Sequence, residues 1–126
     1  MLIERTLRSV GATVAASRHA LEQGCGLQIS GGYHHAHRDF GSGFCLFNDL
    51  VIAARACLDE GSCEQVLIVD LDVHQGDGSA ALCTGSRDII TLSLHGEHNF
   101  PHHKPASHLD FALPSGMEDD AYLETL

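Results

Sequence analysis

Apolar residues near the start of the chain follow the spacing of three and four that marks one face of an α-helix. The positions on this face are Leu7, Val10, Val14, Ser17 and Leu21. They predict an amphipathic helix from about Glu4 to Gln23. Gly24 and Gly26 follow, and glycine is the residue most often found where a helix ends.

A second helix is predicted over residues 50–59 or 50–60. Asn48 or Asp49 lies at its start, and either side chain can accept a hydrogen bond from the free N–H groups of a first helical turn. Gly61 follows the last turn and ends this helix.

Three short apolar runs predict strands. They are Leu27-Gln28-Ile29-Ser30, Val66-Leu67-Ile68-Val69 and Ile89-Ile90-Thr91-Leu92-Ser93-Leu94. The run at 66–69 has no polar interruption, as in a strand that is covered on both faces. Helices alternate with these strands, and a short helical segment is expected between the second and third. This order predicts an α/β fold with parallel strands joined by right-handed crossovers. Near Met117 the chain approaches a further helix.

Polar clusters follow each predicted strand. Residues 31–43 come after the first strand, 70–78 after the second and 95–103 after the third. Active sites of parallel sheets lie beyond the carboxyl ends of the strands. The three clusters are therefore expected to converge on one rim of the sheet.

Composition excludes several classes of protein. The 126 residues contain 7 Lys+Arg and 17 Asp+Glu, so the formal net charge is −10, and 44% of the residues are hydrophobic. This length and apolar content suit one domain with a core. No apolar run approaches the ~20 residues of a membrane span, and the first residues carry charge, so we expect a soluble, cytoplasmic protein without a membrane partner. The negative charge disfavours direct nucleic-acid binding.

The cysteines and the histidines of the chain indicate different kinds of chemistry. The five cysteines are an odd number without a Cys-x-x-Cys pair, which indicates reduced thiols rather than a disulfide framework or a zinc ribbon. The ten histidines include nine after residue 33, and most of these lie in clusters. Imidazole binds metals when neutral and titrates near pH 7, so the clusters predict a metal or proton-transfer site.

A candidate metal-binding motif is the segment Asp70-Leu71-Asp72-Val73-His74. Side chains alternate along a strand, so the two carboxylates and the imidazole share one face. Zinc accepts a carboxylate oxygen and an imidazole nitrogen. A calcium EF-hand loop is excluded because Gln75 and Ala81 stand where that loop needs glycine and glutamate. An Asp-x-Asp site of the nucleotide-sugar transferase type remains open, but it does not explain the histidines.

Adjacent imidazoles at His34 and His35 follow the Gly31-Gly32 turn. General acid–base catalysis by histidine needs a carboxylate behind each ring to fix its tautomer. Asp70 and Asp77 are available for this purpose. The glycine pairs of the chain lack the spacing of nucleotide-binding loops, so a phosphate site is not expected.

These motifs resemble the zinc-dependent histone deacetylase family. The matching runs are Gly31-Gly32-Tyr33-His34-His35-Ala36, Ser42-Gly43-Phe44-Cys45-Leu46-Phe47-Asn48-Asp49 and Val69-Asp70-Leu71-Asp72-Val73-His74-Gln75-Gly76-Asp77-Gly78. Gln75 and the Gly41-Ser42-Gly43-Phe44-Cys45 run look closest to class IV deacetylases and similar bacterial proteins. The resemblance implies a three-layer, arginase-like α/β fold. It also implies that residues 1–126 form a single partial domain, the central part of a family catalytic domain.

The resemblance implies roles for individual residues. Asp72 and His74 would bind zinc, and His35, backed by Asp77, would take a proton from the attacking water. His34, backed by Asp70, would be its electrostatic and acid partner. A potassium site would use the side chains of Asp70 and Ser93 with the backbones of Asp72, His74 and Leu94. Substrate would contact Gly43, Phe44 and Phe100.

The implied reaction is hydrolysis of an N-acyl amide such as acetyl-lysine or an acetylpolyamine. In the family, a third zinc ligand and an oxyanion-stabilising tyrosine come from segments downstream of the motifs found here. The alternative hypothesis is therefore a catalytically impaired metal-binding or oligomeric protein that keeps the deacetylase core. Self-association is also expected if the chain is stable alone, because its apolar strands need covers.

Overall fold

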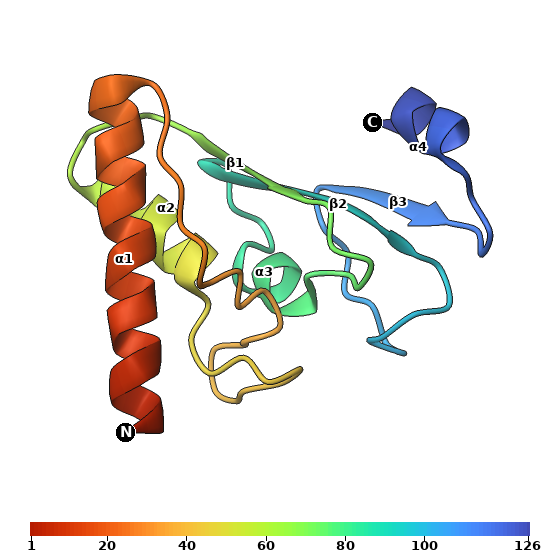
Figure 1. The fold of residues 1–126 in the computed structure, drawn as a ribbon, viewed down its shortest axis with the longest axis horizontal. Coiled ribbons are helices and arrows are strands. Elements are labelled where there is room, and N and C mark those ends of the chain that lie inside the picture. Colours follow the sequence, from red (N-terminus) through yellow and green to blue (C-terminus); the bar gives the residue numbers. More distant parts are fainter.

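The computed structural model describes residues 1–126 and contains helices and strands in an alternating order (Figure 1). In chain order the elements are α1 (Leu2–Gln23), α2 (Asp49–Asp59), β1 (Val66–Asp70), α3 (Asp77–Leu82), β2 (Ile89–Gly96), β3 (Leu109–Leu113) and α4 (Asp119–Thr125). Both long predicted helices and the strands at 66–69 and 89–94 are present, each within a few residues of its expected limits.

The three strands form one parallel sheet in the order β1-β2-β3. Val66 lies opposite Ile89, and Asp70 lies opposite Ser93. Parallel strands need a crossover connection, and α3 lies in the connection from β1 to β2 (Figure 1). The predicted α/β class with a mainly parallel sheet is confirmed.

Helices cover one face of this sheet. α1 packs against α2, and α2 lies with the end of α3 against β1 and β2. The core at this contact consists of Ala54, Ile68, Cys83 and Ile89. The opposite face of β1 is open, because Leu67 is 55% exposed and Val69 is 48% exposed. The side chains of β1 therefore alternate between the core and an uncovered apolar surface.

The ends of the two long helices follow their local sequence. Gly24 ends α1 in the left-handed conformation, with φ of 87°, and its N–H donates to the carbonyl of Ala20. Asn48 is the N-cap of α2, and its side-chain oxygen accepts a hydrogen bond from the N–H of Val51 at 3.1 Å. Asn48 rather than Asp49 is thus the cap, which leaves the Asp49 carboxylate free for another role.

Two segments differ from expectation. Residues 27–30 are not a strand: Leu27 is 85% exposed and Ile29 is 94% exposed, and the segment pairs with no other strand. A strand needs a neighbour for its backbone, and this segment is tied to α1 through side chains instead. No strand is predicted at Leu109–Leu113, but this segment, with Leu109, Phe111 and Leu113 at alternate positions, pairs with β2 as β3.

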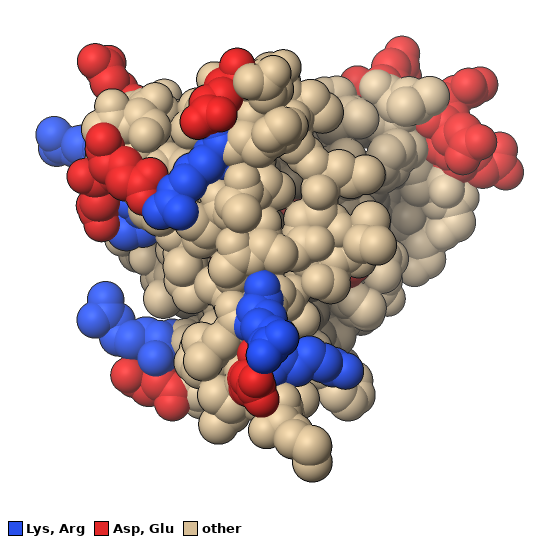
Figure 2. Space-filling view, turned by 60° about the vertical axis from the view of Figure 1, so that its left-hand side comes forward, with Lys and Arg blue, Asp and Glu red and all other residues tan.

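Charge is unevenly spread over the surface. Figure 2 shows acidic side chains gathered at the upper right without a basic neighbour, where α4 and its N-cap carry Glu118, Asp119, Asp120 and Glu124. Basic side chains lie elsewhere on this view, most of them next to acidic ones. No helix is both long and apolar enough to span a membrane.

Candidate active site

A buried carboxylate holds the turn that carries the paired histidines. Asp49 is fully buried, and its Oδ2 accepts hydrogen bonds from the Thr13 hydroxyl at 2.6 Å and the Gly32 N–H at 3.1 Å. Its Oδ1 accepts from the N–H of Tyr33 at 2.7 Å. A carboxylate that collects several N–H and O–H donors is well compensated for its burial. The first turn of α2 thereby fixes the backbone just before His34.

His34 is buried and paired with Asp70 at the end of β1. Its Nδ1 lies 2.6 Å from Asp70 Oδ2, and its carbonyl accepts a hydrogen bond from the N–H of Ser79 at 3.0 Å. Burial opposes protonation of the ring, but the hydrogen bond and the charge of Asp70 outweigh it and raise the pKa of His34. Asp72 and Asp77 act in the same direction.

His35 forms a second pair, with Asp77 at the start of α3. Its Nδ1 lies 2.6 Å from Asp77 Oδ1, and both residues are buried. An ionised carboxylate only accepts hydrogen bonds. The Nδ1 atoms of His34 and His35 therefore each carry a proton and donate a hydrogen bond to Asp70 and Asp77, respectively. The centroids of the His34 and His35 rings lie 4.0 Å apart and the ring planes are tilted by 44°, so two imidazoles with the same tautomer lie side by side.

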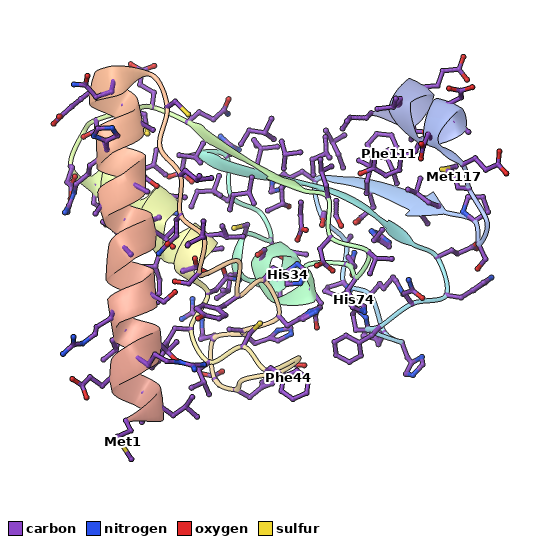
Figure 3. The ribbon with its side chains drawn as sticks, viewed as in Figure 1. Met1, His34, Phe44, His74, Phe111 and Met117 are labelled. Carbon is purple, nitrogen blue, oxygen red and sulfur yellow. The ribbon has the colours of Figure 1, made fainter.

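Asp72 and His74 lie beside these pairs on the loop that follows β1. Asp72 Oδ1 lies 2.9 Å from His74 Nδ1 and accepts the N–H of His74 at 2.8 Å. Burial raises the pKa of Asp72, but the hydrogen bonds from His74 and the charge of His34 outweigh it, and the net shift is downward. Figure 3 shows His74 beside His34, with Phe44 on a loop beneath them.

The donors of Asp72 and His74 fit a metal ion in part. Zinc binds one carboxylate oxygen or one imidazole nitrogen per ligand, and these two donors are side by side and half exposed. No group of three or more His, Cys, Asp or Glu side chains in the structure is arranged to hold one ion. Asp72 and His74 therefore form a pair of donors, whereas a catalytic zinc site takes three protein ligands.

Of the three residues expected to contact substrate, Phe100 and Gly43 lie against the His35 ring, whereas Phe44 is exposed. The ring of Phe100 lies 4.9 Å from the ring of His35, so the segment after β2 reaches the histidine pair as expected. Gly43, at φ 51°, packs so closely on the His35 ring that a Cβ at this position would overlap it. Phe44 is fully exposed on the same loop, at φ 64°, and has no aromatic neighbour.

Two of the residues expected at a potassium site, Asp70 and Ser93, lie side by side at the end of β1. Asp70 and Ser93 are register partners, and Ser93 and Leu94 are each only 2% exposed. Ser93 Oγ lies 3.0 Å from Nδ1 of His95, a ring whose pKa is lowered by burial. Oxygen ligands are what hard cations bind, so this cluster has suitable donor chemistry.

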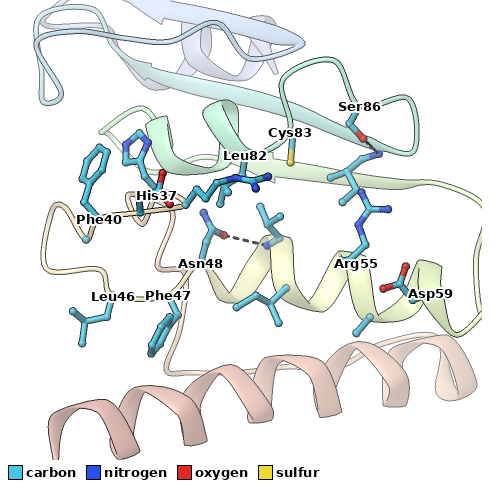
Figure 4. Close-up of a pocket in the computed structure, with 17 residues that line it drawn as sticks. His37, Phe40, Leu46, Phe47, Asn48, Arg55, Asp59, Leu82, Cys83 and Ser86 are labelled. Atoms are coloured by element: carbon cyan, nitrogen blue, oxygen red, sulfur yellow. Dashed lines mark hydrogen bonds between the residues drawn. The ribbon is translucent and has the colours of Figure 1, made fainter.

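Two residues of the site were not singled out from the sequence. Asp49 looks like an ordinary helix-cap residue, and its contact with Tyr33 is made only by the fold. Nε2 of His37 donates a hydrogen bond to Asp77 Oδ2 at 3.0 Å. The only sequence signal for this contact is the position of His37 two residues after His35. His37 lines a cavity of about 840 Å³ between α2, α3 and the 37–47 loop (Figure 4).

The histidine and aspartate pairs, the glycine packed on His35 and the parallel sheet agree with one protein family. A sequence profile of the histone deacetylase domain matches residues 1–126, the whole chain. The chain belongs to the histone deacetylase family. The family assignment made from the motifs is therefore confirmed.

Relatives within this family include both histone deacetylases and an acetylpolyamine amidohydrolase. An uncharacterized protein of Picosynechococcus sp. is 47% identical over 125 residues, covering 99% of this chain and 42% of that protein. Histone deacetylase 2 of Arabidopsis thaliana is 30% identical, covering 94% and 32%. Acetylpolyamine amidohydrolase 2 of Pseudomonas aeruginosa is 40% identical over 67 residues, covering 53% and 19%. The chain thus spans less than half the length of these relatives.

The fold agrees with that of a solved structure. The crystal structure of the HDA15 HD domain matches with a TM-score of 0.68 and 24% sequence identity. The match covers 84% of this chain and 35% of that one. It shows that the parallel sheet and its helices are arranged as in that domain.

Proposed function

We propose that this chain supplies the acid–base half of a zinc-dependent deacetylase site that hydrolyses an N-acyl amide. The observation that carries the proposal is the pair of hydrogen bonds of 2.6 Å that join His34 to Asp70 and His35 to Asp77. Both imidazoles are buried, share a tautomer and stand next to the donors of Asp72 and His74. General acid–base catalysis needs imidazoles that are fixed in this way.

In this proposal Asp72 and His74 would hold zinc, which would lower the pKa of water and polarise the amide carbonyl. His35 takes a proton from the attacking water at Nε2, because its Nδ1 already donates to Asp77. His34, whose pKa is raised above that of a free imidazole, supplies positive charge and a proton to the departing amine. Potassium at Asp70 and Ser93 would stabilise the same loop.

The substrate class is an acylated amine, with acetyl-lysine and acetylpolyamine as the two forms to compare. Phe100 offers an apolar wall beside His35, which suits the methylene chain of either form. The net charge of −10 attracts cationic amines rather than anions.

The proposal is tested on the protein that carries this chain, with added zinc. We expect about one zinc ion per chain and release of acetate from an acetyl-lysine peptide or an acetylpolyamine. His35→Ala should lower kcat roughly 10²–10⁴-fold, because the general base is lost. His19→Ala is the matched control, since His19 is exposed on α1, and it should leave the rate unchanged.

A folded protein that binds zinc but releases acetate from neither substrate contradicts the proposal. That result would favour a metal-binding or oligomeric protein that keeps the deacetylase core without the reaction. Equal rates for His35→Ala and the unchanged protein would also contradict the proposal, because they would show that His35 is not the general base.

A further inference from the structure

The carboxylate of Asp77 is shared by two histidines. Oδ1 lies 2.6 Å from His35 Nδ1, and Oδ2 lies 3.0 Å from His37 Nε2. Asp77 is only 6% exposed, so these two rings supply the side-chain hydrogen bonds of a buried negative charge. Asp70 differs, because its Oδ2 binds one histidine, His34, while its Oδ1 accepts the backbone N–H of Asp72 at 3.1 Å. The two aspartates of the site are therefore held in different ways.

His37 is itself held in place by its neighbours. The N–H of His37 donates to the carbonyl of Phe40 at 3.0 Å, which closes the turn from residue 37 to residue 40. The rings of His37 and Phe40 stack at a centroid distance of 4.3 Å and an interplanar angle of 14°. Figure 4 shows this stacked pair at one end of the cavity. The turn and the stacking leave the His37 ring little rotational freedom.

The hydrogen bond from His37 has a consequence for His35. A carboxylate bound through one oxygen can rotate about its Cβ–Cγ bond, whereas binding through both oxygens fixes its plane. Oδ1 of Asp77 can then meet Nδ1 of His35 in a single geometry. Groups behind a reacting imidazole determine its orientation and its basicity.

We propose that His37 is a positioning residue for His35, acting through the second oxygen of Asp77. This inference rests on the proposed function, because it assigns His35 as the general base. His37 does not touch the reacting atoms. It holds the Asp77 carboxylate in the plane that keeps Nε2 of His35 directed at the substrate.

Three variants of His37 test this role. His37→Gln places an amide N–H close to the position of Nε2, whereas His37→Asn is too short to reach Asp77. We expect kcat of His37→Asn and His37→Ala to fall about 10- to 100-fold with KM unchanged, and His37→Gln to recover most of the loss. His19→Ala again serves as the control. Gln and Asn are both polar amides, so their contrast separates reach from a general effect on folding.

Proton NMR of the histidine ring N–H groups provides a readout that does not depend on turnover. The short hydrogen bond from His35 Nδ1 to Asp77 should give a low-field proton signal in the protein with and without zinc. We expect the signal to persist in His37→Gln and to shift or broaden in His37→Asn.

The outcomes separate this inference from the proposed function. If the unchanged protein releases no acetate, the proposed function fails, while the NMR comparison still decides whether His37 orders the His35–Asp77 pair. If His37→Asn folds, retains the low-field signal and has the same kcat as His37→Gln, the positioning role of His37 is wrong.

Discussion

The position of the His35 ring depends on a residue without a side chain. Gly43 lies against that ring, and a Cβ at this position would overlap the ring carbon Cδ2. Its φ of 51° is also in the region that favours glycine. Two separate features therefore favour glycine at position 43: the close contact with the His35 ring and the positive φ. Substitutions at two glycines can distinguish their effects.

Gly43→Ala tests the close approach, and Gly61→Ala is its matched control. Gly61 has a similar φ of 67°, but no atom lies within 4 Å of the place that a Cβ would occupy there. Both changes should lower the free energy of unfolding by about 1–2 kcal/mol through backbone strain. Only Gly43→Ala should also displace His35, with a roughly 10²-fold loss of kcat/KM. Urea unfolding and initial rates measure the two effects, and equal rates in the two variants would contradict the assigned contact.

At the scale of elements, α2 connects the core to the turn that carries His34 and His35. Asn48 caps the helix, while Asp49 binds the turn that leads into His34. Asn48 Nδ2 also donates to the hydroxyl of Ser79 at 2.9 Å, which links α2 to α3. Two neighbouring residues at one helix end thus join three segments of the site.

Asp49→Asn should destabilise the chain by about 1–3 kcal/mol, because an amide replaces one of two acceptor oxygens and leaves a buried donor without its partner. Asp59→Asn is the control, since Asp59 lies exposed at the other end of α2. Chemical denaturation gives the difference, and the amide signals of Gly32 and Tyr33 should move in Asp49→Asn only. Equal stability of the two variants would show that the Asp49 contacts do not hold the turn.

For the whole molecule, the decisive feature is a sheet that is covered on one face. Ile68 and Ile89 pack under α2, whereas Leu67 and Val69 lie on the open face. Only 26 of the 126 residues are buried, so few side chains support the fold. Each of them should carry a large share of the stability.

Ile89→Ala and Leu67→Ala test this asymmetry. Ile89 is 1% exposed, so truncation should cost about 2–5 kcal/mol through lost contacts and a cavity. Leu67 is 55% exposed, and its truncation should change stability by about 0.5 kcal/mol. Urea midpoints compare the two variants. A similar large loss for Leu67→Ala would mean that the open face is covered in solution, as self-association would produce.

The sequence by itself determined α1, α2, β1 and β2, because their apolar spacing and helix-end residues are local signals. It also determined the family, since the residues of the histidine turn and of the Asp70–Gly78 segment are contiguous in the chain. Local patterns were misleading at residues 27–30, because an apolar run becomes a strand only when another strand pairs with it.

The family resemblance implied the pairs His34–Asp70 and His35–Asp77, whereas only the tertiary structure decided the further contacts around them. Asp49 reaches a turn 16 residues away in the chain, and His37 meets Asp77 across 40 residues, so neither contact has a local signal. The structure also showed β3, whose residues become a strand by pairing with β2. Residue types and spacing thus determine the chemistry that is available. The packing of distant segments determines which carboxylate holds which imidazole, because hydrogen bonds between them exist only once the chain has folded.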